Sequence, residues 1–320
     1  MVGNTPDLTG LSEWASTEVA STKTVKGQVM YVPLQFWFCK NPGLALPLIA
    51  LQYHEVKINL ELRDAKDCYW SGTHDGTAWT TNMSSSVASV PSLDSCSLYV
   101  DYVFLDTEER RRFAQLSHEY LIEQLQFTGD ESTNTQSNKV KLNFNHPTKS
   151  LVWVVQPDEF LTDKALTFGK QWFNYTDADE TTTESSVLAG AAGGAGALSQ
   201  TALFGAGENP VRLAKLQLNG HDRFSERDGR YFNLVQPYQH FENVPAKGIN
   251  VYSFALKPED HQPSGTCNMS RIDNATLHLT LTENTVKSGM NTRSAKVKIF
   301  ALSYNVLRVM SGMGGIQFAS

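Results

Sequence analysis

The stretch that decides the fold is GINVYSFALKPEDHQPSGTCNMSRIDNATLHLTL, residues 248–281. Apolar and polar residues alternate over 249–255 and again over 275–281, and successive side chains of a strand point to opposite faces. The connection between these two predicted strands is long and contains Pro258 and Pro263, which cannot donate to a ladder. A tight hairpin is therefore excluded. The pattern predicts a chain that crosses from one sheet to the other of a sandwich or jelly roll.

A similar pattern occurs earlier in the chain. An aromatic strand is predicted over 28–38, a break follows at the KNPG sequence of residues 40–43, and an alternating strand is predicted over 52–62. After a polar loop comes another apolar strand, over 98–105. Roughly the same order recurs over 249–309, so the sequence predicts a duplicated β domain.

The second copy is preceded by further apolar segments. Strands are predicted at 140–146, 151–156, 211–218, 231–235 and 296–309. With the two strands of the opening stretch this makes about eight, the number that a jelly roll needs, whereas the first copy has only about three or four. We therefore expect residues 128–320 to form a complete second roll and residues 1–127 to hold only the later part of a first roll. The glycine-rich tail 311–315 is expected to be an arm or a sheet edge.

One helix is expected between the two copies, over about 106–121. Asp106 is a suitable N-cap, Glu109 stands three residues later, and acidic residues complement the positive helix start. We expect this helix to pack on a sheet and to hold the two rolls in a fixed relation, with a stripe formed by Phe113, Leu116 and Tyr120. Residues 177–207 are a low-complexity segment rich in Ser, Thr, Ala and Gly, and are expected to form a long surface loop.

The composition of the chain limits the classes of function that it can have. The 320 residues include 33 acidic and 27 basic side chains, giving a net charge of −6, which argues against direct nucleic-acid binding. The basic run at 110–112 directly follows two glutamates and is typical of a solvated helix start. The four cysteines do not have the spacing of metal ligands, and we expect them to be free thiols. The sequence leaves open whether Cys68 and Cys96 form a disulfide. No apolar run approaches the ~20 residues of a membrane span.

Catalytic patterns are absent from the sequence, so no catalytic, cofactor or metal-binding residue is predicted. His54 and Glu55 point to opposite strand faces and cannot share a metal. The acidic pair at 158–159 and the three acids at 177, 179 and 180 are expected to be solvated loop residues. Ser264 lacks a nucleophile-elbow context, and the polar residues 221–223 are expected to serve a turn. Possible glycosylation sequons stand at Asn82, Asn174, Asn268 and Asn274.

Several segments together resemble the major capsid proteins of nucleocytoplasmic large DNA viruses, the family of iridoviruses, phycodnaviruses and mimivirus relatives. The residues that carry the resemblance are VPLQFWF (32–38), NPGLALP (41–47), 106–113, LQLNGHDRF (216–224), 251–274 and YNVLRVMSG (304–312). The resemblance implies an all-β double jelly roll and a trimeric capsomer with a pseudo-hexagonal outline in an icosahedral capsid. Family members carry well over a hundred residues before the point that resembles residues 4–8, so we expect this chain to correspond to the C-terminal portion.

The resemblance also implies partners and location. These are other copies in a homotrimer, neighbouring capsomers, minor capsid proteins and a nearby internal viral membrane, in a virion assembled in the host cytoplasm. Two other functions stay open from the residues alone. A carbohydrate-binding, lectin-like jelly roll would need exposed aromatic side chains, for which Trp70 and Trp79 are the candidates. A jelly-roll metalloenzyme would need stoichiometric metal.

Overall fold

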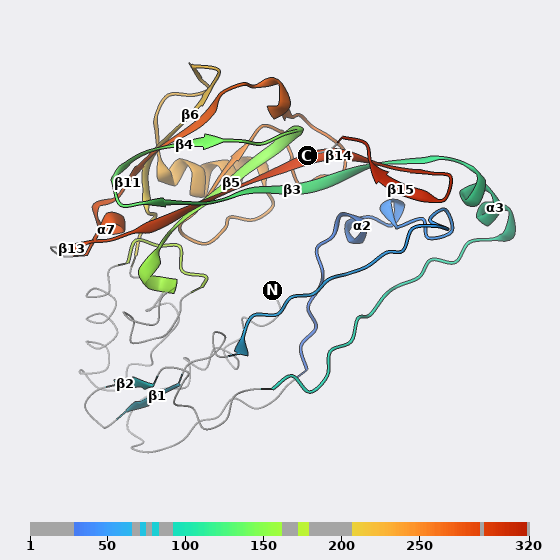
Figure 1. The fold of residues 1–320 in the computed structure, drawn as a ribbon. Helices are drawn as coiled ribbons and strands as arrows, with labels where there is room; N and C mark the ends of the chain where they lie inside the picture. The colour runs from blue at the N-terminus through green and yellow to red at the C-terminus, as the bar shows by residue number, and fades with distance from the viewer. Residues whose placement is uncertain are drawn as a thin grey trace.

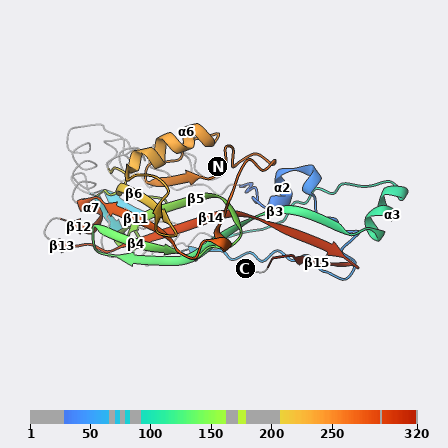
Figure 2. The same cartoon turned by 90° about the horizontal axis from the view of Figure 1, so that it is seen from above.

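The structure is a computed structural model that describes residues 29–65, 71–74, 79–82, 92–161, 172–178, 207–288 and 291–318. Two antiparallel sheets pack face to face in the half of the chain that follows residue 118 (Figure 1). Seen from above, β14 runs along much of the molecule, with α3 and β15 at one end and α7, β12 and β13 at the other (Figure 2).

The first sheet has six strands. Its members are β3 (His118–Thr133), β5 (Pro147–Pro157), β9 (Ile249–Ser253), β10 (Cys267–Asn268), β14 (Ala295–Met310) and β15 (Met313–Ile316). The long strand β14 pairs with β3 along one side and with β5 on the other, and β5 pairs in turn with β9. The short strands β10 and β15 extend the ladder at the start of β5 and at the end of β14.

The second sheet has five strands. Its members are β4 (Ser137–Leu142), β6 (Val211–Leu218), β7 (His221–Asp222), β8 (Arg227–Asp228) and β11 (Ala275–Leu281). The strand β11 lies between β4 and β6, and β7 and β8 both pair with β6. Along the chain the strands alternate between the sheets: β3 then β4, β5 then β6, β9 then β11, and finally β14. This alternation is the jelly-roll arrangement.

The core lies between the two sheets. Burial alternates along β11, whose inward residues Ala275, Leu277, Leu279 and Leu281 are all at most 3% exposed. Trp153 of β5, at 1% exposed, meets the ring of Phe232 with centroids 5.2 Å apart. The alternation predicted for residues 275–281 is therefore confirmed, and so is the sheet crossing predicted for the opening stretch, because β9 and β11 belong to different sheets.

The linker helix is shorter than predicted. The helix α3 covers Thr107–Gln115, and the Glu109 carboxylate accepts a hydrogen bond from the Asp106 backbone N–H at 3.4 Å, as the capping pattern predicts. The prediction that the helix extends to 121 is wrong, because β3 starts at His118 and runs antiparallel to β14. Tyr120 is therefore a strand residue, and the expected domain division at 127 and 128 falls inside β3.

The prediction of a strand over 231–235 is also wrong. Tyr231–Val235 is a π-helical turn, which continues into the helix α6 (Gln236–His240). Asn233 is buried here, and its Nδ2 donates to the backbone oxygens of Ala246 and Ile249. A short apolar run does not by itself distinguish a strand from a buried helical turn.

The first copy differs most from its prediction. Residues 29–36, 54–62 and 98–105 belong to no helix or strand and have no ladder partner among the described residues, so the strands predicted there are not formed. Pro33 removes a ladder donor from the first of them, and the chain then forms α2 (Trp37–Lys40) and the 3-10 turn η2 (Pro42–Leu44). Of the two copies, only the second forms a two-sheet sandwich within the described ranges.

Three smaller elements complete the fold. A hairpin of β1 (Ser71–His74) and β2 (Trp79–Asn82) lies between residues 62 and 98, where a polar loop was predicted. The helix α7 (Glu283–Val286) precedes a second hairpin, β12 (Lys287–Ser288) with β13 (Asn291–Thr292). The 3-10 turns η5 (Asp158–Leu161) and η7 (Met269–Arg271) follow β5 and β10.

The low-complexity segment lies mostly outside the described residues, but its two flanks are placed. The Asp177 backbone N–H donates to the Glu208 carbonyl at 3.0 Å, and the Glu208 N–H donates to the Asp177 carboxylate at 2.7 Å. The two described flanks of this segment are therefore hydrogen-bonded to each other. Among the other expected features, the tail is a sheet edge, β15, and Cys96 is a free thiol, whereas Cys68 lies outside the described residues.

Candidate functional site

The best-formed polar site joins the first copy to the second. Residues 36–53 lie against the β3, β14 and β15 end of the six-stranded sheet, on the side opposite to β4 and β11 (Figure 1). The Tyr53 backbone N–H donates to the Gly312 carbonyl at 2.9 Å in the β14–β15 turn, and Ala50 is 5% exposed. We call this contact region the joint.

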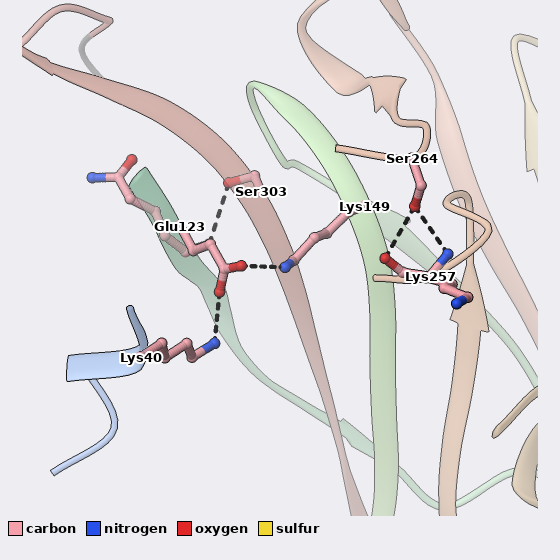
Figure 3. A network of polar contacts seen from close by, with 7 residues as sticks. Lys40, Glu123, Lys149, Lys257, Ser264 and Ser303 are labelled. Carbon is pink, nitrogen blue, oxygen red and sulfur yellow. Dashed lines mark hydrogen bonds and ion pairs between the residues drawn. The ribbon is translucent and has the colours of Figure 1, made fainter. Parts of the chain in front are cut away.

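An ion network holds the joint together. The Glu123 carboxylate of β3 contacts Lys40 of α2 at 2.7 Å through one oxygen and Lys149 of β5 at 2.5 Å through the other (Figure 3). The Lys149 side chain is completely buried, and its ammonium lies 5.2 Å from the centroid of the Tyr304 ring. One carboxylate therefore binds two strands of the second roll to a helical turn of the first copy.

The strand register explains why these residues meet. Glu123 is directly opposite Tyr304 on β14, so both side chains point to the outer face of the sheet. The β5–β14 ladder shifts register where Leu302 pairs with Ser150 and Ser303 pairs with Thr148, which leaves Lys149 as an extra residue. Such a bulge re-aims a side chain, and here it turns a lysine within a buried strand toward Glu123.

Burial and charge act against each other in this pair. Burial raises the pKa of the Glu123 carboxyl, but the hydrogen bonds and charges of Lys149 and Lys40 outweigh it, so this pKa lies below its ordinary value. Burial lowers the pKa of the Lys149 ammonium, and the hydrogen bond and charge of Glu123 offset only part of that effect. The charges of the pair are therefore maintained by their mutual contact rather than by water.

A cavity of about 140 Å³ lies beside the network. It is lined by Trp37, Lys40, Asn41, Leu44, Leu121, Glu123, Glu259, His261 and Tyr304. Two of these residues, Glu259 and His261, come from the proline-containing connection between β9 and β11, which is fixed by Ser264: its hydroxyl accepts from the Lys257 N–H at 2.9 Å and donates to the Lys257 carbonyl at 3.0 Å (Figure 3). The long connection predicted between these two strands therefore also contributes to the joint.

The chemistry of the joint is that of a cross-link. Two ammonium groups and one carboxylate provide no nucleophile paired with a base, and the Lys149 ammonium is sealed from solvent. Within the described ranges, no group of three His, Cys, Asp or Glu residues is arranged to hold a metal ion. In the same part of the chain, no helix has the length and apolar character to cross a membrane.

The acidic residues considered from the sequence make structural contacts. The Glu159 carboxylate pairs with the buried Arg293 guanidinium at 2.9 Å, and Asp158 accepts a hydrogen bond from the Ser294 hydroxyl at 2.6 Å. Asp177 accepts from Thr282 at 2.7 Å, whereas residues 179 and 180 lie outside the described residues. The expectation that these loop acids are solvated is wrong for Asp177, which is 5% exposed, and Glu159 and Asp158 are held by the contacts given above.

The remaining polar candidates are placed separately from one another. His54 and Glu55 are exposed on the extended segment, and Asp222 of β7 pairs with Lys215 at 3.1 Å. Trp70 lies outside the described residues, and Trp79 is on β2, where only the backbone is described. The described residues therefore do not test whether Trp70 and Trp79 form the exposed aromatic cluster that a carbohydrate-binding surface would need.

The four sequons differ in accessibility. Asn174 is 2% exposed, and its Oδ1 accepts hydrogen bonds from the Thr176 N–H at 3.1 Å and the Thr176 hydroxyl at 2.7 Å. Asn268 and Asn274 are exposed. Asn82 ends β2, where only the backbone is described. A glycan needs a free side-chain nitrogen at the surface, so the geometry at Asn174 is unsuited to one.

The ion network was not predicted from the sequence. Lys149 could have indicated such a network from the sequence. It lies in the strand sequence PTKSLVWVVQP, and most of the residues that follow it in this strand are apolar. A charge in a strand buried on both faces requires an opposite charge. The identity of its partner was hidden, because Glu123 fell in a segment beyond the predicted helix and 26 residues from Lys149.

The fold and the joint together define an all-β jelly-roll protein of a structural kind. Residues 109–315 match the family described as "Large eukaryotic DNA virus major capsid protein", and residues 7–106 match "Major capsid protein N-terminus". The chain belongs to this major capsid protein family, as its resemblance in sequence predicted.

Individual relatives agree with the family match. The major capsid protein of Phaeocystis pouchetii virus is 50% identical over 100% of this chain and 73% of its own length. That of Paramecium bursaria Chlorella virus 1 is 42% identical over 97% of this chain and 70% of its own length. A solved structure of the PBCV-1 virus capsid is similar with a TM-score of 0.63 and 38% identity, covering 95% of this chain and 74% of that one.

Proposed function

We propose that this chain is the shell-forming subunit of an icosahedral viral capsid and acts as a homotrimer with a pseudo-hexagonal outline. The observation that carries the proposal is the likeness to the PBCV-1 capsid structure over 95% of the chain at 38% identity. Its function is then one of assembly geometry, without catalysis. The site chemistry agrees with this, because the network of Glu123 fixes one part of the chain against another.

The proposed domain division has the later part of a first roll, with the linker helix, in residues 1–127 and a second, complete roll in residues 128–320. The two family matches meet between residues 106 and 109, next to α3, which supports a change of domain close to the helix. Two rolls in each subunit give six similar blocks in a trimer, and in this chain the first of the two rolls is represented by its later part. This is the physical basis of a pseudo-hexagonal trimer.

The proposed partners follow from a place in the capsid. They are neighbouring capsomers, minor capsid proteins and the surface of a nearby internal membrane, in particles assembled in the host cytoplasm. A net charge of −6 supports a shell that makes no direct nucleic-acid contact. The hydrogen bonds between Asp177 and Glu208 support an external or neighbour-contacting role for the low-complexity segment, because they hold its two ends side by side.

Light scattering tests the proposal on the purified full chain. A mass of three chains that persists on dilution supports the trimer. A monomer at every concentration contradicts it, and a monomer that binds immobilised glycans would favour the carbohydrate-binding alternative.

A further inference from the structure

A two-residue turn joins β6 to β7 and consists of an asparagine followed by a glycine. Leu218 of β6 pairs with His221 of β7, so Asn219 and Gly220 form the turn between them. Their φ angles are +50° and +82°, in the left-handed region that favours these two residue types. Both residues are exposed, and a Cβ added to Gly220 would meet nothing within 4 Å. The turn is therefore open to water on the side of the glycine.

The side-chain amide of Asn219 is held at its oxygen. This Oδ1 accepts a hydrogen bond from the Asn274 N–H at 3.1 Å, and the Asn219 backbone N–H donates to the Asn274 carbonyl at 2.7 Å. Within the described part of the chain, neither the Asn219 Nδ2 nor the Gly220 N–H makes a hydrogen bond. A donor at Oδ1 stabilises negative charge that develops on this oxygen. The amide is thus polarised at its carbon atom, and its nitrogen is free to leave.

We propose that Asn219 is a site of spontaneous deamidation, at which the Gly220 backbone nitrogen attacks the side-chain amide. The step forms a bond between this nitrogen and Cγ of Asn219 and breaks the bond from Cγ to Nδ2. The Gly220 amide proton leaves with Nδ2 as ammonia, and the product is a cyclic imide. Water then opens the imide at either carbonyl and gives aspartate or isoaspartate. Water is the only co-reactant, and it reaches an exposed turn.

Asn268 provides an internal comparison in the same chain. It is exposed, and its Oδ1 accepts a hydrogen bond from the Ser270 N–H at 3.1 Å, the same distance as at Asn219. The residue that follows is different, because the Met269 N–H donates to the His146 carbonyl at 3.1 Å. Met269 is also only 3% exposed. The two sites therefore differ in the attacking nitrogen, which is free at one and held at the other.

Isoaspartate changes the structure at this turn, whereas aspartate leaves the main chain unchanged. Isoaspartate adds one carbon atom to the main chain between residues 219 and 220, and a two-residue turn of fixed register does not accommodate it. Asn274, which holds both hydrogen bonds of Asn219, directly precedes β11, and the inward side of β11 lies in the core. Formation of isoaspartate therefore loosens the link between the turn and the start of β11.

The test is to age the purified full chain in heavy-oxygen water at physiological pH and temperature, and then to digest it in ordinary water for peptide mass spectrometry. Opening of the imide takes one oxygen atom from the water, so the label separates conversion during ageing from conversion during digestion. The Asn268 peptide is the matched control from the same digest. Gly220→Ala is the comparison variant, because its methyl group crowds the attacking nitrogen, and thermal unfolding checks that this variant is folded.

We expect Asn219 to convert roughly tenfold faster than Asn268, and Gly220→Ala to slow its conversion by a similar factor. Isoaspartate is expected among the products, and the Asn274 amide is expected to exchange hydrogen faster in the aged chain. Equal conversion of the two asparagines overturns the inference, as does an Asn219 peptide that stays unconverted or converts equally fast in Gly220→Ala. If that variant does not fold, the comparison with Asn268 still decides. The oligomer mass, which tests the proposed function, is measured independently of these peptides.

Discussion

The Lys149 ammonium lies 2.5 Å from the Glu123 carboxylate, joining β5 to β3 across β14. The lysine is fully buried and the glutamate side chain is 15% exposed, so neither charge is well solvated. Breaking one partner of such a pair leaves the other charge without compensation. The joint therefore depends on both residues together.

Glu123→Gln is expected to lower the free energy of unfolding by about 3 kcal/mol, because it leaves the Lys149 ammonium buried without an anion. Urea denaturation measures the change. Glu119→Gln is the matched control, since Glu119 pairs with Arg308 where both side chains are about half exposed, and such pairs contribute under about 1 kcal/mol. Equal losses in the two variants would show that Glu123 has no special role.

Replacing both partners should cost much less than replacing one. Glu123→Leu with Lys149→Met removes both buried charges and keeps apolar volume in the sheet. We expect this double variant to stay within about 1 kcal/mol of the unmodified chain in urea denaturation. A loss equal to the sum of the two single substitutions would mean that the residues stabilise the fold independently.

The contribution of Glu123 should depend on pH in acid. Its pKa is held below the ordinary carboxyl value in the folded protein, so its stabilisation is fully present above the unfolded pKa and is lost as pH falls through the folded pKa. The stability difference between the unmodified chain and Glu123→Gln should be constant near neutral pH and shrink in acid. Urea titrations from neutral to acidic pH measure it, and a difference independent of pH would contradict the ion-pair description.

Gly312 is expected to be essential for docking residues 50–53. Its φ is +80°, and a Cβ there would lie 2.5 Å from Cδ2 of the Tyr53 ring. Gly312→Ala should therefore displace Tyr53, and hydrogen exchange of the Tyr53 amide, which donates to the Gly312 carbonyl, should become faster. Gly315→Ala is the control, because its Cβ would meet nothing within 4 Å. Unchanged exchange in Gly312→Ala would show that the joint is not clamped there.

The sequons should be modified unequally. When the folded protein is treated with a soluble N-glycosyltransferase, peptide mass spectrometry is expected to find Asn174 unmodified, since its side chain is buried and hydrogen-bonded to Thr176. Asn268 and Asn274 are exposed and serve as internal comparisons. Modification of Asn174 without prior denaturation would contradict the placement of residues 172–178.

The second roll was predictable because its strands carry local signals. Alternation over residues 275–281 fixes which side chains enter the core, and the prolines at 258 and 263 exclude a hairpin, so the sheet crossing followed from the sequence. The first copy was not predictable in the same way. Alternating apolar and polar residues over 52–62 form a strand only if another strand pairs with them. No described residue pairs with this segment.

The joint depends on relationships that a single sequence does not display. Lys149 and Glu123 are brought together by a register shift in the β5–β14 ladder, and no residue type in the sequence indicates that shift. The turn at Tyr231–Val235 was misread for a related reason: its apolar residues satisfy a strand pattern, while the buried Asn233 bonds to carbonyls that only the folded chain supplies.

Electron microscopy of the assembled full chain tests the central proposal most directly. Class averages of the purified oligomer should show three-fold symmetry with a pseudo-hexagonal outline. Averages showing single-chain particles, or open filaments without closed symmetry, would contradict a trimeric capsid subunit.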